Sequence, residues 1–457
     1  MDTLPPEVKG PIIRLAMADD YGHNLWKYAA ISREWQVLAE PVAFKALDLD
    51  PHRLSEAAEI MTPLRQSHVR KISYALILPQ IKEELSRSEA QRASEALFAE
   101  LDNLLGHLRK WNMPSGKVKL VLGQWRPMDQ AWLNLNDRML LNLRPDDYRQ
   151  LPEVPSITSF GVLVDTWLSP KACCEISTRF PLLRSIGWRL CDFHHESGVC
   201  GRRDFANALH LIPESVRKFG LEYSCLDDPT WPAIPAWLMP GKSDPLGQAL
   251  RQLSVQLEEV SLSMDVGCDF LPRDDELWPH MREVDVLSMD RWTKDVEDDI
   301  SENNQGQLER PSYHTRIDSN SDLHDRINQH YLISGQVAAR MPNLRYMRMF
   351  WANDFDACCI YTAEHNPPSA KVAICKAPAL ASGLRQDVEA VWCTTAITHL
   401  GEGAELRFEL EFDDGDISRQ DHIRNGNEEY LEFVWSRNSK WTYTTDWTHR
   451  LKWTRTV

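Results

Sequence analysis

Apolar and polar positions in the first residues of the chain recur with the period of a short helix. Val8, Ile12 and Leu15 follow one another at spacings of four and three residues, which places them on one helical stripe. Pro5 and Pro6 suit the first turn, because a proline there removes an N–H that has no partner inside the helix. The pattern therefore predicts a short amphipathic helix at the N-terminus.

A second helix is predicted to begin near Asn24, which is a good N-cap residue. We expect it to end at Glu40-Pro41, because proline disfavours helical geometry in the residue before it. Its apolar positions are Leu25, Tyr28, Ala29, Ser32, Trp35 and Leu38, and further apolar anchors follow at Phe44, Leu47 and Leu49. Helices this short bury little surface alone, so they need a larger body or a partner. Periodicity alone also allows them to be the first helices of a larger helical domain.

Beyond residue 50 the chain returns to one short theme, in which an apolar residue and a polar step lead into an alternating, strand-like run. Strands are predicted over 74–78, 188–190, 221–223, 262–264, 286–289 and 346–350, and helices over 169–179 and 203–211. The first apolar residues of the six units are Val69, Leu183, Val216, Leu257, Met281 and Leu344, separated by 114, 33, 41, 24 and 63 residues. This uneven spacing predicts an irregular leucine-rich-repeat-like solenoid with long insertions. The alternative is an α/β domain with a mixed sheet.

Past residue 391 the pattern changes to alternation typical of strands, over 405–412 and 429–435. Trp435, Trp441, Trp447 and Trp453 follow at intervals of six, so extended chain places all four on one face. They form either an aromatic ladder that faces a ligand or the end of the core. We favour the second interpretation, in which 391–457 is a β-rich cap.

Charge and cysteine usage narrow the class of protein. The net charge is −16, from 51 Lys and Arg against 67 Asp and Glu, which disfavours a nucleic-acid or anionic membrane partner. The segment 295–325 holds nine acidic residues against two arginines and little apolar material, so it is predicted to be a mobile insertion. Ten scattered cysteines, no long apolar run and a polar N-terminus predict a reduced, cytoplasmic or nuclear protein without a membrane span.

Motifs for catalysis or metal binding are weak in this sequence. Cys191, His194, His195 and Cys200 place four zinc-binding residue types in ten residues, but structural zinc sites pair two such groups across a longer loop. Phosphate-binding glycine loops and nucleophile elbows are absent from the sequence. Basic residues Arg202, Arg203 and Arg348 are predicted to be solvated, and the acidic pairs Asp227-Asp228 and Asp274-Asp275 to lie in loops. We therefore predict no catalytic residue, metal site or cofactor, and zinc in the purified protein would contradict this.

Two residue strings resemble the F-box, a helical module of ubiquitin ligases. They are Leu4-Pro5-Pro6-Glu7-Val8 and Ile31-Ser32-Arg33-Glu34-Trp35, in the order and spacing of that family, although the stretch between them is longer than usual. The resemblance implies a helical F-box over 1–50 that binds a Skp-type adaptor. It implies contacts from Leu4, Pro5, Ile12 and Ile31, and Trp35 either packs between the helices or joins the interface.

Further strings are similar to a class of fungal F-box proteins, among them Ser169-Pro170, Asp244-Pro245-Leu246 and Ala338-Ala339-Arg340-Met341-Pro342. This resemblance implies an α+β or α/β fold, with a recognition domain over 51–390 behind the F-box. It further implies a non-catalytic client-recognition subunit of a cullin–RING (SCF-type) ubiquitin ligase, joined to a cullin through the adaptor. The client is unknown. The alternative is a protein-binding scaffold whose F-box-like module does not lead to degradation.

Overall fold

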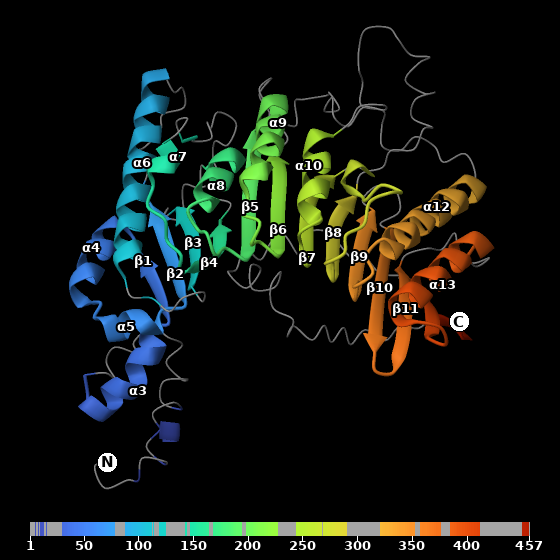
Figure 1. Cartoon of the computed structure of the whole chain (residues 1–457), viewed down its shortest axis with the longest axis horizontal. Coiled ribbons are helices and arrows are strands. Elements are labelled where there is room, and N and C mark those ends of the chain that lie inside the picture. Colours follow the sequence, from blue (N-terminus) through green and yellow to red (C-terminus); the bar gives the residue numbers. More distant parts are fainter. Residues whose placement is uncertain are drawn as a thin grey trace. The chain divides into compact units, whose positions relative to one another are not determined.

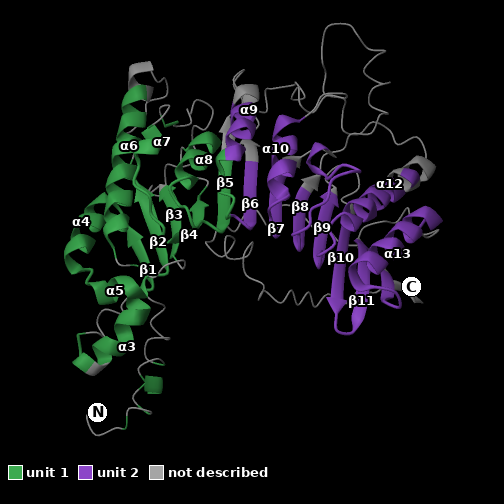
Figure 2. Cartoon of the chain, in the orientation of Figure 1, with its two compact units in different colours: residues 1–190, 211–215 green, residues 191–210, 216–457 purple. Residues whose placement is uncertain are grey.

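A computed structural model of the chain describes residues 5, 8, 10–12, 15, 30–77, 87–111, 113, 118–124, 142–143, 147–163, 168–193, 198–226, 244–266, 268–289, 320–351, 357–375, 384–411 and 450–456. The chain divides into two compact units, which comprise residues 1–190 with 211–215, and residues 191–210 with 216–457 (Figure 2). Both units combine helices with an open sheet, and most neighbouring strands are parallel (Figure 1). The mixed α and β content that the sequence predicts is confirmed.

The sheet of unit 1 is parallel, and its strands follow one another in chain order. The strands are β1 (Ala46–Leu49), β2 (Lys71–Leu76), β3 (Val118–Gln124), β4 (Ile157–Val162) and the part of β5 (Ser185–Phe193) that ends at Leu190. The helices are α3 (Arg33–Ala43), α4 (Pro51–Ile60), α5 (Pro63–His68), α6 (Arg87–Lys110), α7 (Asp147–Gln150) and α8 (Pro170–Ser177). Strand β1 lies within the range predicted as F-box and pairs with β2, so the sheet begins before residue 50.

The same two-residue signal starts three of these helices. Asp50, Thr62 and Ser169 are each followed by proline, which is favoured in the first helical turn. Each of these side chains accepts a hydrogen bond from the backbone N–H three residues on, and this satisfies a donor that the helix leaves unpaired. The signal recurs in unit 2, where Asp244 precedes Pro245 and accepts from the backbone of Leu246.

Unit 2 begins with four parallel strands and ends with a mixed sheet. Strands β6 (Lys218–Leu226), β7 (Glu259–Val266), β8 (Glu283–Met289) and β9 (Tyr346–Trp351) are parallel neighbours in chain order. Strands β10 (Ala357–His365) and β11 (Pro368–Cys375) form an antiparallel hairpin, followed by β12 (Glu405–Glu411) and β13 (Arg450–Thr456). The helices are α9 (Gly198–Ala208), α10 (Pro245–Ser254), α12 (Asn320–Ala339) and α13 (Gln386–Leu400), with short turns η2 (Leu209–Leu211) and η4 (Cys268–Phe270).

The strands β6 to β9 keep their connections on one side. Parallel neighbours need a crossover connection, and crossovers are right-handed, so strands joined in chain order have their crossovers on the same face. Helices α10 and α12 lie in these crossovers (Figure 1). The opposite face of β6 to β9 is therefore left open by the helices that the structure describes.

The theme that recurs along the sequence marks the start of six of the strands. Val69, Leu183, Val216, Leu257, Met281 and Leu344 are all buried, and each lies two residues before the first residue of a strand. The residue between each of these apolar residues and its strand continues the backbone hydrogen bonds between neighbouring strands. For example, the N–H of Arg282, just before β8, donates to the carbonyl of Glu258, just before β7, at 2.7 Å. All six predicted strands are confirmed, and the first five begin three residues earlier than predicted. The predicted helices over 169–179 and 203–211 correspond to α8 and to α9 with η2.

One sequence prediction was wrong in this region of the fold. Helix α3 does not end at Pro41 but continues to Ala43, with Pro41 inside it. Proline removes one hydrogen bond there, to the carbonyl of Val37, and Val37 is highly exposed, so water can satisfy that carbonyl. Residues 320–325 of the predicted mobile insertion belong to helix α12, and the rest of that insertion, 295–319, lies outside the described residues.

Two arginines predicted to be solvated are in fact ion-paired within unit 2. Arg202 donates to both carboxylate oxygens of Asp244, at 3.0 and 2.7 Å, and the two side chains are only 4% and 5% exposed. Arg348 donates to both oxygens of Asp285, at 2.8 and 2.5 Å. These partners lie 42 and 63 residues away in the chain, so local sequence does not reveal them.

At the C-terminal end, the predicted strand over 405–412 is confirmed as β12. Trp453 lies in β13 and stands opposite Phe408 in the antiparallel register. Trp435, Trp441, Trp447 and the predicted strand over 429–435 lie outside the described residues. The choice between an aromatic ladder and a core end therefore stays a prediction.

Candidate protein-interaction site

Helix α3 is held against α5, within unit 1, by a partly buried ion pair. The Oε1 atom of Glu40 accepts hydrogen bonds from Nε and Nη2 of Arg65, at 3.0 and 2.7 Å, and from Nε2 of Gln36 at 2.8 Å. Burial acts to raise the pKa of Glu40, but the hydrogen bonds from Arg65 and Gln36 outweigh it and hold that pKa below its ordinary value. The carboxylate therefore stays charged and anchors the C-terminal half of α3.

Arg65 ties this anchor to its surroundings. Its Nη1 atom donates to the carbonyl of Ile60 at 2.8 Å, and its guanidinium lies 5.1 Å from the centre of the Phe44 ring, as in a cation–π contact. Nearby, the Gln66 side chain donates to the carbonyl of Met61 at 2.8 Å. The end of α3 is thus held in a defined position against the turn between α4 and α5.

Several large apolar side chains on and near these helices are exposed. Ile31 and Val37 expose 58% and 65% of their surface, and Leu64 at the start of α5 exposes 64%. Among the large apolar side chains that are exposed in the described part of the chain, seven lie before residue 65: Val8, Leu15, Ile31, Val37, Val42, Ile60 and Leu64. Concentrations of exposed apolar residues mark surfaces that other proteins cover. We call the exposed surface of Ile31, Val37 and Val42 the α3 face; Val37 and Val42 lie about 140° apart around the helix, so this surface covers more than one side of α3.

The predicted adaptor-binding residues are described to different extents. Leu4 lies outside the described residues. Pro5 is exposed, its carbonyl accepts from the N–H of Val8 at 3.0 Å, and Ile12 is half-buried. Ile31 is exposed and Trp35 is half-buried, on either side of the N-cap residue Ser32. Ile31 and Trp35 therefore both lie near the start of α3.

Val37, Val42 and Leu64 were not predicted from the sequence as interaction residues. A signal for the first two was present, because α3 carries apolar residues on more than one stripe, and a surface helix needs only one. Leu64 directly follows Thr62-Pro63, a helix start that gives no indication of exposure. Its exposure depends on the packing of α5 against α3, which the sequence does not show.

Metal-binding and thiol groups were the chemistry that the sequence left open. They include no group of three or more His, Cys, Asp or Glu side chains that is arranged to hold a metal ion. His194 and His195 lie outside them, so the Cys191–Cys200 cluster is not described as a whole. Cys173 and Cys174 are fully buried, and burial raises the pKa of both thiols well above the ordinary range, which leaves them unreactive. None of the described helices is both long and apolar enough for a membrane span.

Comparisons with known proteins add no family to this picture. No protein-family model, curated protein or solved structure matches the chain.

Proposed function

We propose that this chain is the client-recognition subunit of a cullin–RING (SCF-type) ubiquitin ligase and that its N-terminal helices bind a Skp-type adaptor. The observation that carries the proposal is the α3 face, where Ile31, Val37 and Val42 leave apolar surface exposed. One of the F-box-like strings of the sequence, Ile31–Trp35, includes Ile31 and continues into the first turn of α3. Small interfaces gain most of their binding free energy from a few buried apolar anchors.

In this proposal the chain performs no bond chemistry. The adaptor connects it to a cullin, and the remainder of the chain holds a protein client close to the ubiquitin-carrying enzyme. The gain is one of effective concentration, because two partners on one scaffold meet far more often than free partners do. The proposed place of action is the cytoplasm or nucleus, in keeping with the scattered cysteines.

The recognition region, in the same proposal, is an irregular leucine-rich-repeat-like array. Its support is the buried apolar residue two positions before six strands, together with parallel strands in chain order. The long and unequal segments between the strands are then insertions in the repeats. Such arrays offer one continuous open face for a partner.

The test is co-purification of the full chain with a Skp-type adaptor. We expect a stable complex that Ile31→Glu and Val37→Glu weaken at least tenfold, because burying such a side chain contributes about 1.5–3 kcal/mol. Leu4→Ala and Pro5→Ala should weaken it as well. The matched control is Leu182→Glu, since Leu182 is also an exposed apolar residue of unit 1, at 46%, but lies far along the chain before β5.

Absence of a complex with the wild-type chain would refute the proposal. Equal weakening by Leu182→Glu would show that the effect is not specific to the α3 face. A complex that forms, combined with clients that are not stabilised when the ligase is blocked, would favour the non-degradative scaffold instead.

A further inference from the structure

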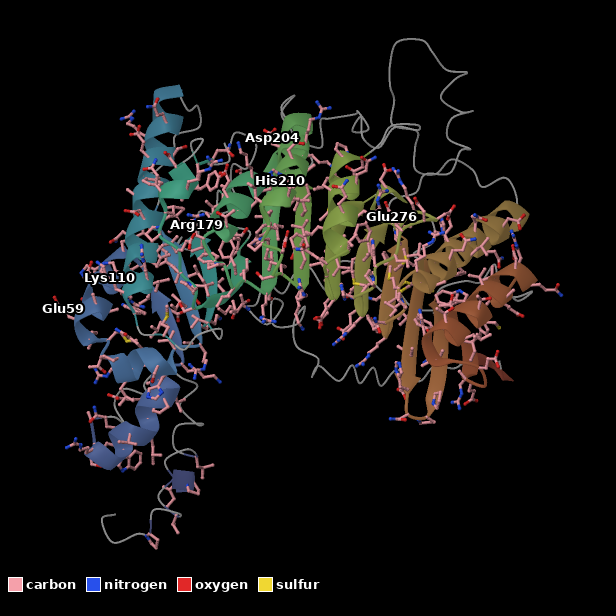
Figure 3. All side chains as sticks on the ribbon, in the orientation of Figure 1. Glu59, Lys110, Arg179, Asp204, His210 and Glu276 are labelled. Atoms are coloured by element: carbon pink, nitrogen blue, oxygen red, sulfur yellow. The ribbon has the colours of Figure 1, made fainter. Side chains whose placement is uncertain are left out.

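The hairpin of β10 and β11 brings two cysteines to the same level of the sheet (Figure 1). Cys358 stands directly opposite Cys375 in the antiparallel register, at the ends of the two strands that lie away from the hairpin turn. Residues that stand opposite each other share a face of the sheet, because successive side chains of a strand point to alternate faces (Figure 3). The two cysteines are 17 positions apart in the sequence, and the hairpin is what pairs them.

Cys358 lies on the less buried face of β10. The other face packs against α13, where Tyr361 stacks on Trp392, and Cys359 is fully buried on that side. Cys358 is only half-buried, and its thiol is free. A small oxidant in water can therefore reach Cys358, whereas Cys359 is shielded by the core.

The spacing of the two strands at this level suits a disulfide. The N–H of Ala363 donates to the carbonyl of Arg345 at 2.9 Å, so odd-numbered residues of β10 direct their backbone groups toward β9 and even-numbered ones toward β11. Cys358 and Cys375 are therefore a hydrogen-bonded pair, whose Cα atoms lie about 5.5 Å apart in an antiparallel sheet. Disulfides span Cα separations of about 4.4–6.8 Å.

The same register makes such a bond easy to reduce. Residues directly opposite each other hold their Cβ atoms about 4.5–5.5 Å apart, and hydrogen-bonded pairs lie at the longer end of this range. A relaxed disulfide needs about 3.8 Å between Cβ atoms, so the strands must draw together and the bond is strained. Strained disulfides are the labile ones, and in a reducing compartment disulfides are typically transient and regulatory.

We propose that Cys358 and Cys375 form a reversible disulfide when the protein is exposed to a peroxide. The Cys358 sulfur would attack hydrogen peroxide, so that an S–O bond forms, the O–O bond breaks and one water leaves. The Cys375 sulfur would then attack this sulfenic acid, so that the S–S bond forms, the S–O bond breaks and a second water leaves. The two thiols lose two electrons and two protons, which reduce one peroxide to two waters. Two glutathione molecules would reverse the change and become oxidised glutathione.

The disulfide would join β10 and β11 at the end opposite their turn, so that the hairpin is closed at both ends. Strands β9 and β12 pair with the outer edges of this hairpin. Oxidation should therefore slow the opening of the mixed sheet of unit 2. The inference goes beyond the proposed function and does not depend on it.

The test is peptide mapping of the full chain after treatment with hydrogen peroxide and blocking of the remaining thiols. Trypsin cuts after Arg348, Lys371 and Lys376, so the two cysteines fall in different peptides, 349–371 and 372–376. We expect these peptides to be joined, with two hydrogens lost, and to separate again after treatment with glutathione. Hydrogen exchange of β10 and β11 should slow at least about threefold on oxidation, while that of α6 in unit 1 stays unchanged.

Cys358→Ser and Cys375→Ser should each abolish the joined peptides. The matched control is Cys359→Ala, because Cys359 lies in the same tryptic peptide but stands opposite Ile374 on the other face. A second control is Cys393→Ser, since Cys393 in α13 is also half-buried and lies 18 positions from Cys375. Both controls should form the bond like wild type, and thermal unfolding establishes that each variant is folded.

Three results would overturn the inference. The first is oxidation of the wild-type chain that leaves the peptides 349–371 and 372–376 separate. The second is a bond that persists in Cys358→Ser or disappears in Cys359→Ala, since Cys359 would then be the reacting residue. The third is joined peptides found only in covalent dimers, since the cysteines would then react between chains. Loss of adaptor binding alone would refute only the proposed function, and absence of the joined peptides alone would refute only this inference.

Discussion

The hydroxyl of Tyr361 lies 2.7 Å from Nδ1 of His399, and Nε2 of the same imidazole lies 3.1 Å from the carbonyl oxygen of Ala338. A carbonyl can only accept, so Nε2 carries the proton and Nδ1 accepts from the tyrosine. The ring of Tyr361 also stacks on Trp392, with 5.3 Å between ring centres. One neutral histidine thus links β10, α12 and α13 inside unit 2.

This arrangement predicts that unit 2 loses stability as the pH falls. Burial, and then the nearby His365, lower the pKa of His399 below its ordinary value of 6.5, against the opposing effect of the Ala338 and Met341 carbonyls. The unfolded chain therefore binds a proton more readily than the folded chain, so unfolding is favoured as the pH falls through the unfolded pKa. Thermal unfolding of unit 2 should show a steeper loss between pH 7 and pH 5 in wild type than in His399→Gln.

Removing the tyrosine hydroxyl tests the same link at fixed pH. Tyr361→Phe keeps the stacked ring but leaves Nδ1 of His399 buried without its donor, at a cost of about 1–3 kcal/mol. Denaturant unfolding at pH 7.5 gives the change. A variant as stable as wild type would show that the hydrogen bond contributes nothing to the stability of unit 2.

Glu175 predicts the opposite pH dependence in unit 1. This carboxyl is buried in α8, its Oε2 atom has no hydrogen-bond partner among the described residues, and Lys171 approaches Oε1 no closer than 3.9 Å. Burial raises its pKa to about 7, and Asp147 adds to the rise while Lys171 opposes it. The folded chain binds the proton more tightly than the unfolded chain, so stability is present at low pH and is lost as the pH rises through 7.

Glu175→Gln should therefore be more stable than wild type at pH 8, by on the order of 1–2 kcal/mol, because an amide needs no charge in the buried site. At pH 5 the two proteins should unfold at similar temperatures. A destabilised variant at pH 8 would contradict the account.

The pair of Arg202 and Asp244 predicts a large cost for removing one partner. In Arg202→Ala the carboxylate of Asp244 stays buried without its cation, which costs about 3–5 kcal/mol. Hydrogen exchange should show faster opening of α9 and α10, since Asp244 also caps α10. Arg203→Ala is the control, because Arg203 is exposed and adjacent.

Two glycines predict opposite effects of one added methyl group. A Cβ at Gly335 in α12 would lie 2.7 Å from Cγ1 of Val391 and 3.2 Å from Cε2 of Trp392, so Gly335→Ala should destabilise unit 2 by about 1–3 kcal/mol. A Cβ at Gly106 in α6 would meet nothing within 4 Å. Gly106→Ala should stabilise unit 1 by about 0.5–1 kcal/mol, since alanine favours the helix interior. Denaturant unfolding of both variants decides whether close packing or propensity dominates.

The sequence predicted the parts of the fold that depend on local pattern. Leu257 and Met281 mark strand starts because a buried apolar residue and the alternation after it are both visible in a few residues. The prediction that α3 ends at Pro41 was wrong because the helix tolerates proline at this position. The carbonyl of Val37, which loses its hydrogen bond, lies at an exposed residue where water can reach it, and the sequence alone does not show this exposure. The pairs of Arg202 with Asp244 and of Glu40 with Arg65 were invisible, because each joins residues that only the folded chain brings together. Leu64 was not predicted as part of the candidate site for the same reason, because its exposure depends on how α5 packs in the folded chain.

The strands of each unit pair in the order in which they occur in the chain. During synthesis, a newly released strand therefore finds its partner already present and need not wait for a distant segment. Growth by addition to a finished edge requires little reorganisation, and it tolerates segments of any length between strands. A chain organised in this way can gain or lose long loops without changing which strands meet.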